Sequence, residues 1–246
     1  MRPVILLFLI PAFLANCQKE QSSPPSPTTP THGVNTNPLP MEQIDILALG
    51  DSYTKGQGVN WEKNFPNQLA DALKAEKYTV AGVHIIAQTG WRTDQLQAAI
   101  NSQADKIGDS TFSIVTLCIG VNNQYQNADF ETYKLQFEEL LQTAIARADG
   151  RKGRVLVVSI PDWAYTPYGQ HYGDPATTSG EIDAYNAANY AISTSYGVHY
   201  VQVTNISRQG LVRPDFVASD GLHPSAIQYT EWLRVMMPVV RDALKQ

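Results

Sequence analysis

The feature that most constrains the fold of this chain is a regular alternation of two apolar patterns. Downstream of Ile44, short runs rich in β-branched residues alternate with stretches whose apolar residues recur at helical spacing. This alternation is typical of a parallel sheet with helices on both faces. We therefore predict an α/β domain with three layers, α/β/α, and a five-stranded parallel sheet in the order 2-1-3-4-5. The runs expected to form strands are 44–49, 83–88, 114–119, 155–160 and 198–203.

The expected helices lie between these strands and after the last of them. Apolar residues at helical spacing predict helices over 65–73, 130–145 and 182–196. A capping box at 178–181 is expected to open the third of these. A final helix is expected from about Pro224, because proline suits the first helical turn.

The N-terminal 40 residues differ in composition from the rest of the chain. An apolar run over 4–14 follows one basic residue and is too short to span a bilayer, but it suits the core of a signal peptide. The run ends in Leu-Ala-Asn-Cys, which resembles a bacterial lipobox with Asn16 where Gly, Ala or Ser is usual. Residues 21–40 are rich in Pro, Ser, Thr and Asn, as expected of a disordered tether. We therefore expect a signal peptide over 1–16, a lipidated Cys17 with a tether over 17–40, and a folded domain over 41–246.

This N-terminus predicts where the protein resides. Acylation of Cys17 with two or more chains would anchor the chain stably at a membrane. We expect an exported cell-envelope lipoprotein of a Gram-negative bacterium, and the sequence leaves open which membrane face displays the domain. The alternative is an ordinary secreted protein whose leader happens to end near a cysteine.

Charge, cysteine and histidine content exclude several classes of function. The chain has 18 basic and 23 acidic residues and no basic patch that would indicate nucleic-acid binding. Cys118 lies in an apolar run expected to be a buried strand, so we expect no disulfide. The five histidines lack the spacing of metal ligands, and we expect neither a metal nor a cofactor. One domain is expected, with a monomer as the default and the oligomeric state left open.

A serine and a histidine–aspartate pair follow two of the predicted strands. Ser52 comes directly after the first strand in Gly-Asp-Ser, where the chain must turn sharply, and this suits a nucleophile. Asp220 precedes His223 by three residues, so a short turn can place the carboxylate on one ring nitrogen and leave the other free as a base. Taken singly, Ser52 could be a helix cap and His223 a surface residue.

Two further strand ends carry hydrogen-bond donors. Gly90 follows the second strand and exposes a backbone amide, and Asn122 follows the third strand and offers a carboxamide that stays neutral. Both donors suit an oxyanion, although each alone would be ordinary turn chemistry. In a sheet of this type, the carboxyl ends of the strands meet at one edge, so all these groups are expected to converge there.

The order Gly-Asp-Ser, Gly, Gly-x-Asn and Asp-x-x-His resembles the four sequence blocks of the SGNH (GDSL-type) hydrolases over about residues 44–244. The resemblance implies a flavodoxin-like fold and a serine esterase. It implies Ser52 as nucleophile, His223 as general base, Asp220 as its orienting carboxylate, and the Ser52 and Gly90 amides with Asn122 as the oxyanion hole. In the third block this chain has Asn123 where the family usually has Asp.

The substrate is predicted only by class. The loop at 161–173 is rich in aromatic residues, which either stack on a sugar or simply pack the loop on the domain. Trp163, Tyr165 and Asn123 are the candidate substrate contacts. We expect small-acyl or carbohydrate esters, in small molecules or glycans; the alternatives are a lysophospholipase or thioesterase-like acyl hydrolase and a non-catalytic glycan-binding module.

Overall fold

The computed structural model describes residues 43–103 and 110–245. The predicted signal peptide, Cys17, the tether and the first two residues of the predicted domain lie outside the described residues. Within the described part of the chain, no helix is long and apolar enough to cross a membrane. The longer helices are α2 (Phe65–Ala75), α3 (Thr93–Ser102), α6 (Phe130–Arg147), α8 (Pro175–Tyr196) and α10 (Ala226–Ala243).

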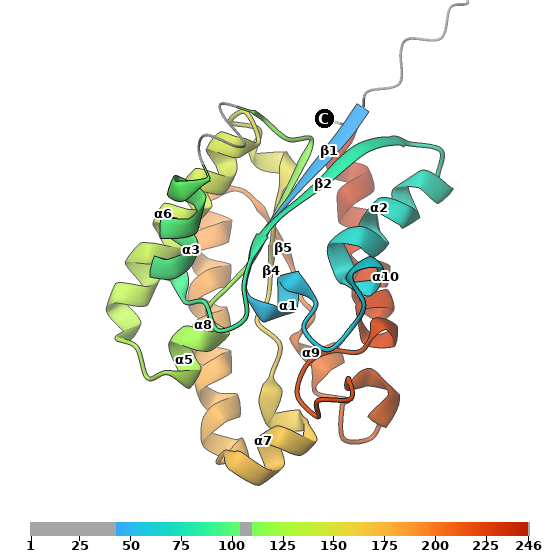
Figure 1. Cartoon of the computed structure of the whole chain (residues 1–246). Helices are drawn as coiled ribbons and strands as arrows, with labels where there is room; N and C mark the ends of the chain where they lie inside the picture. Colours follow the sequence, from blue (N-terminus) through green and yellow to red (C-terminus); the bar gives the residue numbers. More distant parts are fainter. Residues whose placement is uncertain (1–42, 104–109, 246) are drawn as a thin grey trace, which may run out of the picture. The chain divides into compact units, whose positions relative to one another are not determined.

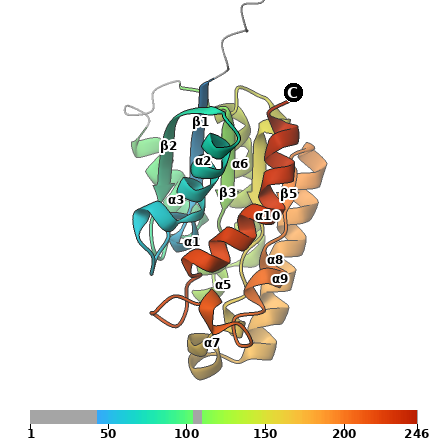
Figure 2. The ribbon, with the colours of Figure 1, turned by 90° about the vertical axis from the view of Figure 1, so that its right-hand side faces the viewer.

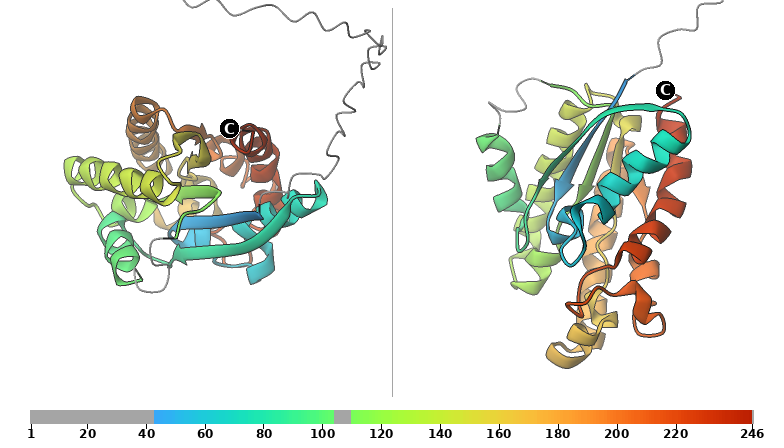
Figure 3. Two further views of the ribbon diagram at one scale, coloured as in Figure 1. Left: turned by 90° about the horizontal axis from the view of Figure 1, so that it is seen from above. Right: turned by 45° about the vertical axis from the view of Figure 1, so that its right-hand side comes forward.

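The five strands form one parallel sheet in the order β2-β1-β3-β4-β5, which confirms the predicted order. Helices α3, α6 and α8 lie on one side of the strands, and α2 and α10 lie on the other, as Figures 1 and 2 show. The view from above in Figure 3 shows the strands between these two groups of helices, so the predicted three-layer α/β/α fold is confirmed. The strands are β1 (Gln43–Gly50), β2 (Thr79–Ala87), β3 (Ile114–Cys118), β4 (Val155–Val158) and β5 (His199–Val201).

The core explains why these runs form strands and helices. Side chains on both faces of the sheet are buried: all five residues of β3 and all four of β4 are inaccessible, as parallel strands covered on two faces require. Large side chains from the helices close the two interfaces. Phe137 of α6 packs on one face, while Leu69 of α2 and Trp232 of α10 are fully buried on the other.

Short elements gather at the carboxyl ends of the strands, which point downward in Figure 1. The chain leaves β1 for β2 on one side of the sheet and reaches β3 on the other, so the connections diverge between β1 and β3. Sites of doubly wound proteins form at such a point. These short elements are α1 (Ser52–Lys55), α5 (Val121–Tyr125), α7 (Pro167–Tyr172) and α9 (Thr204–Ser207), with 3-10 turns η1 (Trp61–Lys63), η3 (Trp163–Tyr165) and η4 (Pro214–Phe216). The remaining 3-10 turn, η2 (Lys152–Arg154), directly precedes β4 and lies at the amino end of that strand.

Two predicted helix starts were wrong. Helix α8 begins at Pro175 rather than at the predicted capping box, because the Asp174 side chain accepts a hydrogen bond from the Ala176 amide and caps the helix earlier. Helix α10 begins at Ala226 with Ser225 as its cap, and Pro224 lies before the helix in an isolated bridge with Val217.

Candidate active site

Ser52 is placed by the turn between β1 and α1. Gly50 ends the strand, and a Cβ at this position would clash with the Thr54 hydroxyl and the Cys118 carbonyl, so only glycine permits the turn. Asp51 then caps α1, with Oδ1 accepting a hydrogen bond from the Tyr53 amide at 3.0 Å. Ser52 is therefore the first residue of a helix, where a backbone amide has no acceptor within the helix.

His223 and Asp220 form the predicted pair. His223 Nδ1 lies 2.7 Å from Asp220 Oδ2. The other carboxylate oxygen, Oδ1, accepts hydrogen bonds from the backbone amides of Leu222 and His223 at 2.9 and 3.0 Å. Partial burial raises the pKa of Asp220, but these two amides and the His223 ring outweigh it and hold the pKa below its usual value. The carboxylate is therefore charged at neutral pH and fixes the orientation of the ring.

Two of the predicted oxyanion donors, Gly90 after β2 and Asn122 on α5, lie in segments that are joined by side-chain hydrogen bonds. Asn122 Nδ2 donates to the Trp91 carbonyl at 3.0 Å, and Gln126 Nε2 donates to the Gly90 carbonyl at 3.0 Å. Gly90 has φ +86°, a conformation that favours glycine. Within the described residues, neither the Gly90 amide nor the Ser52 amide has an acceptor, and Asn122 retains a second N–H.

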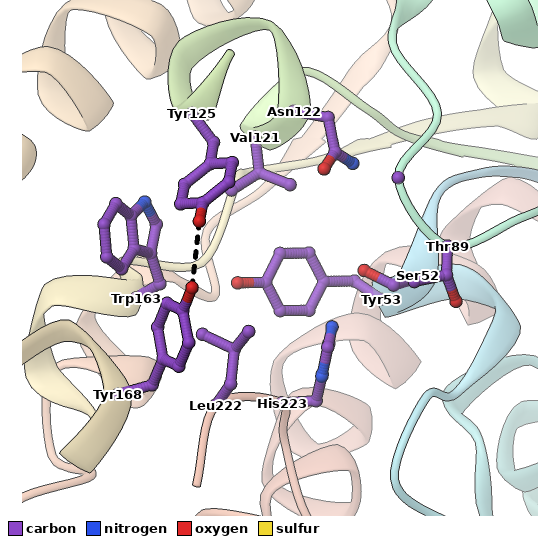
Figure 4. Close-up of a pocket in the computed structure, with 11 residues that line it drawn as sticks. Ser52, Tyr53, Thr89, Val121, Asn122, Tyr125, Trp163, Tyr168, Leu222 and His223 are labelled. Atoms are coloured by element: carbon purple, nitrogen blue, oxygen red, sulfur yellow. Dashed lines mark hydrogen bonds between the residues drawn. The ribbon is translucent and has the colours of Figure 1, made fainter. Parts of the chain in front are cut away.

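All five predicted residues around the reacting centre except Asp220 line one cavity of about 200 Å³. Figure 4 shows the Ser52 side chain and the His223 ring at one end of this pocket and Asn122 above them. The Ser52 hydroxyl makes no hydrogen bond to any described residue, and such contacts in free enzymes commonly tighten only when substrate binds. The lining consists of Ser52, Tyr53, Thr89, Gly90, Val121, Asn122, Tyr125, Trp163, Tyr168, Leu222 and His223.

Opposite Ser52, three side chains form what we call the aromatic wall: Tyr125, Trp163 and Tyr168 (Figure 4). The Tyr125 and Tyr168 hydroxyls are hydrogen-bonded to each other at 2.9 Å, and the Tyr125 and Trp163 rings meet edge to face at 5.4 Å. Trp163 is fixed from behind, because its Nε1 donates to Gln124 Oε1 at 2.9 Å. The wall therefore presents a rigid aromatic surface to the pocket.

Two predicted substrate contacts, Asn123 and Tyr165, do not line the pocket, so this prediction was wrong. Asn123 is 2% exposed, and both its amide atoms bind Thr93: Oδ1 accepts from the Thr93 amide and Nδ2 donates to the Thr93 hydroxyl. Asn123 thus joins α5 to the start of α3. Tyr165 is outside the pocket lining and lies over the Arg208 guanidinium, 5.9 Å from ring centroid to Cζ. Trp163 does line the pocket, as expected of a substrate contact.

Six lining residues were not among the predicted site residues: Tyr53, Thr89, Val121, Tyr125, Tyr168 and Leu222. Tyr125 lies three residues after Asn122 on the same short helix, and this spacing could have indicated that both side chains face one side. Tyr53 directly follows Ser52 and carried no separate signal. Among the described residues, no group of three or more His, Cys, Asp or Glu side chains is placed to hold a metal ion.

A serine, a histidine–aspartate pair and converging amide donors at the carboxyl edge of a doubly wound sheet are typical of enzymes that hydrolyse acyl groups. The sequence comparison identifies the class further: residues 48–230 match the model of the GDSL-like lipase/acylhydrolase family. The chain belongs to this family and is a carboxylic ester hydrolase, which confirms the resemblance seen in the sequence blocks. A search of curated protein sequences finds no match.

Solved structures share the fold at low sequence identity. The crystal structure of TesA is 18% identical with a TM-score of 0.62, covering 81% of this chain and 99% of that one. Axe2, an acetylxylan esterase from Geobacillus stearothermophilus, is 15% identical with a TM-score of 0.62, covering 81% and 95%. A family 3 carbohydrate esterase from Clostridium thermocellum is 20% identical with a TM-score of 0.60, covering 82% and 98%.

Proposed function

We propose that this protein is an exported serine esterase that cleaves small-acyl or carbohydrate esters by two-step acyl transfer. The observation that carries the proposal is the presence of Ser52, His223, Gly90 and Asn122 around one cavity of about 200 Å³. The Asp220 carboxylate on the far side of the His223 ring completes a triad.

In the first step, Ser52 Oγ attacks the ester carbonyl carbon while His223 Nε2 takes the hydroxyl proton. The imidazolium is stabilised by Asp220, 2.7 Å from Nδ1. The carbonyl oxygen becomes an oxyanion, which accepts hydrogen bonds from the Ser52 and Gly90 amides and from Asn122 Nδ2. His223 then returns the proton to the leaving alcohol as the C–O bond breaks, leaving an acyl-enzyme.

In the second step, a water molecule gives its proton to His223 and attacks the acyl-enzyme carbonyl. The same donors hold the second oxyanion, and collapse releases the acid as His223 returns the proton to Ser52 Oγ. A single oxyanion donor typically contributes about 3 kcal/mol to lowering the barrier.

The size of the pocket supports a short acyl group. Pockets that enclose drug-sized ligands measure roughly 300–1,000 Å³, so a cavity of about 200 Å³ suits a smaller group. Two proteins of similar structure, an acetylxylan esterase and a carbohydrate esterase, support esters of this kind. Apolar walls at Val121 and Leu222 favour, as the second candidate, hydrolysis of longer acyl chains of the lysophospholipase or thioesterase type.

The decisive experiment measures hydrolysis of p-nitrophenyl acetate by the full chain and by Ser52→Ala, with both proteins checked for folding by circular dichroism. We expect turnover by the unaltered protein and none above background in the variant. A fluorophosphonate probe should label the unaltered protein alone. Inertness of the folded, unaltered protein in both assays would contradict the proposal. A series of p-nitrophenyl esters from acetate to palmitate then separates the two candidate substrate classes.

A further inference from the structure

Tyr53 crosses the floor of the pocket and is held rigidly there. Its amide donates to Asp51 Oδ1 at 3.0 Å, and its carbonyl accepts a hydrogen bond from the Tyr229 hydroxyl at 2.9 Å. Its ring meets the His223 ring edge to face at 5.7 Å. In Figure 4 the ring extends from the Ser52 end of the pocket toward the aromatic wall, with its hydroxyl on the side of Tyr125 and Tyr168. The side chain therefore spans from the reacting centre to the opposite side of the pocket.

Tyr53 is only 3% exposed, and its hydroxyl, which faces the cavity, has no hydrogen-bond partner among the described residues. Buried tyrosine hydroxyls usually find one. Two other buried tyrosines of this chain do: Tyr133 donates to Asn189 Oδ1 at 2.6 Å, and Tyr229 donates to the Tyr53 carbonyl. Tyr53 Oη has no hydrogen bond to any described residue, yet the residue lines the cavity. A group inside the cavity is thus the available partner.

The hydroxyl is suited to donate a hydrogen bond. Burial, together with the negative charge of Asp51, raises the pKa of Tyr53 well above its usual value, so the hydroxyl keeps its proton throughout the neutral range. A long alkyl chain in the pocket would cover this donor without bonding to it, which is unfavourable. A substrate with an oxygen atom at this place would satisfy it.

We propose that Tyr53 Oη is a specificity-determining donor that binds an oxygen atom on the alcohol half of a polyol or sugar ester. This inference rests on the proposed esterase function and names its substrate class. An acetyl group has no polar atom beyond the carbonyl, which the oxyanion donors occupy, so the partner of Tyr53 belongs to the alcohol. The aromatic wall supplies an apolar surface for the carbon skeleton of that alcohol, and Tyr125 and Tyr168 place two further hydroxyls beside it.

The test compares two esters that differ only in the hydroxyl groups of the alcohol: glycerol 1-acetate and propyl acetate. We expect the full chain to prefer glycerol 1-acetate in kcat/KM by roughly tenfold or more, the factor that corresponds to 1.4 kcal/mol. Tyr53→Phe removes only the hydroxyl, and we expect it to reduce this preference to within about threefold. Because the hydroxyl has no hydrogen-bond partner in the described part of the chain, Tyr53→Phe should also keep the melting temperature of the parent.

Tyr190→Phe is the matched control. It removes a tyrosine hydroxyl outside the pocket lining, so it should leave kcat/KM for both esters, and the preference between them, unchanged. The inference is overturned if the unaltered protein shows no preference, or if Tyr53→Phe preserves the preference or changes both esters equally. Turnover of p-nitrophenyl acetate through Ser52 tests the esterase function separately. Failure of the inference on Tyr53 can therefore be distinguished from failure of the proposed esterase function.

Discussion

Replacing Asp51 with Asn should make the protein more stable, and increasingly so as the pH rises. Asp51 is 1% exposed next to Ser52, and its Oδ2 has no hydrogen-bond partner among residues 43–103 and 110–245. Burial, opposed in part by the backbone hydrogen bond from Tyr53, raises the pKa of Asp51 from 3.8 to about 7. The cap itself should survive in Asp51→Asn, because an asparagine Oδ1 can still accept the Tyr53 amide proton.

The sign and size of the effect follow from proton linkage. The folded protein holds the Asp51 proton more tightly than the unfolded chain does. The carboxyl group therefore contributes stability that is fully present below pH 3.8 and is lost as the pH rises through about 7. Between these values the loss is about 1.4 kcal/mol for each pH unit, and the full difference is on the order of 4 kcal/mol. Asparagine does not titrate and should not show this loss.

The measurement is urea unfolding of both proteins at pH 4.5, 5.5 and 6.5. The free energy of unfolding of Asp51→Asn minus that of the parent should rise by about 1.4 kcal/mol per pH unit. Asp220→Asn serves as the control of opposite sign. The pKa of Asp220 is lowered, so its contribution is present above the unfolded pKa and lost as the pH falls, and its removal should destabilise the protein more at pH 6.5 than at acidic pH. A pH-independent difference for Asp51→Asn would refute the reasoning.

Three further outcomes are expected. Asn122→Ala should lower kcat for p-nitrophenyl acetate by about 10²–10³ with little change in KM, because it removes an oxyanion donor; an unchanged kcat would remove Asn122 from the mechanism. Asn123→Ala leaves the buried Thr93 amide without its acceptor and should cost about 1–3 kcal/mol in urea unfolding. Asn123→Asp keeps an acceptor for that amide and loses only the donation to the Thr93 hydroxyl, which still donates to Gln136 Oε1, so it should cost less; equal losses would contradict this account. Metabolic labelling with an alkyne fatty acid should mark the full chain and not Cys17→Ser, and equal labelling would exclude Cys17 as the anchor.

The order of the strands and the meeting of the candidate residues could be predicted because both depend on patterns of a few residues. Four of the five short apolar runs are followed by a candidate site motif, and a parallel sheet brings the carboxyl ends of its strands together. The start of β2 could not be read in the same way: it begins at Thr79, four residues before the predicted strand, where exposed and half-buried residues pair with the start of β1. This part of β2 is held by backbone pairing with β1, so its side chains need not be buried and no long apolar run indicates the strand.

The loop after β4 shows what local patterns cannot supply. Both Trp163 and Tyr165 were predicted to contact substrate, and they lie in one aromatic segment. Trp163 lines the pocket, whereas Tyr165 does not. That segment folds into η3 and α7, where Asp162 and Thr166 cap successive short turns and set which aromatic side chains face the pocket. Asp162 is itself fixed by Arg208, 46 residues away, through a 2.9 Å ion pair. Contacts at this separation are invisible to a reading of neighbouring residues.

The short helix α5 carries both Asn122, the proposed oxyanion donor, and Tyr125, part of the aromatic wall. The rate of turnover and the range of substrates should therefore both depend on these five residues. We expect a mutation that tilts this helix to change both. Mutations in α7 should have no such double effect, because α7 contributes Tyr168 to the pocket lining and none of the proposed oxyanion donors. Natural divergence and laboratory selection for new esters should therefore accumulate changes in α7 first and leave α5 nearly invariant.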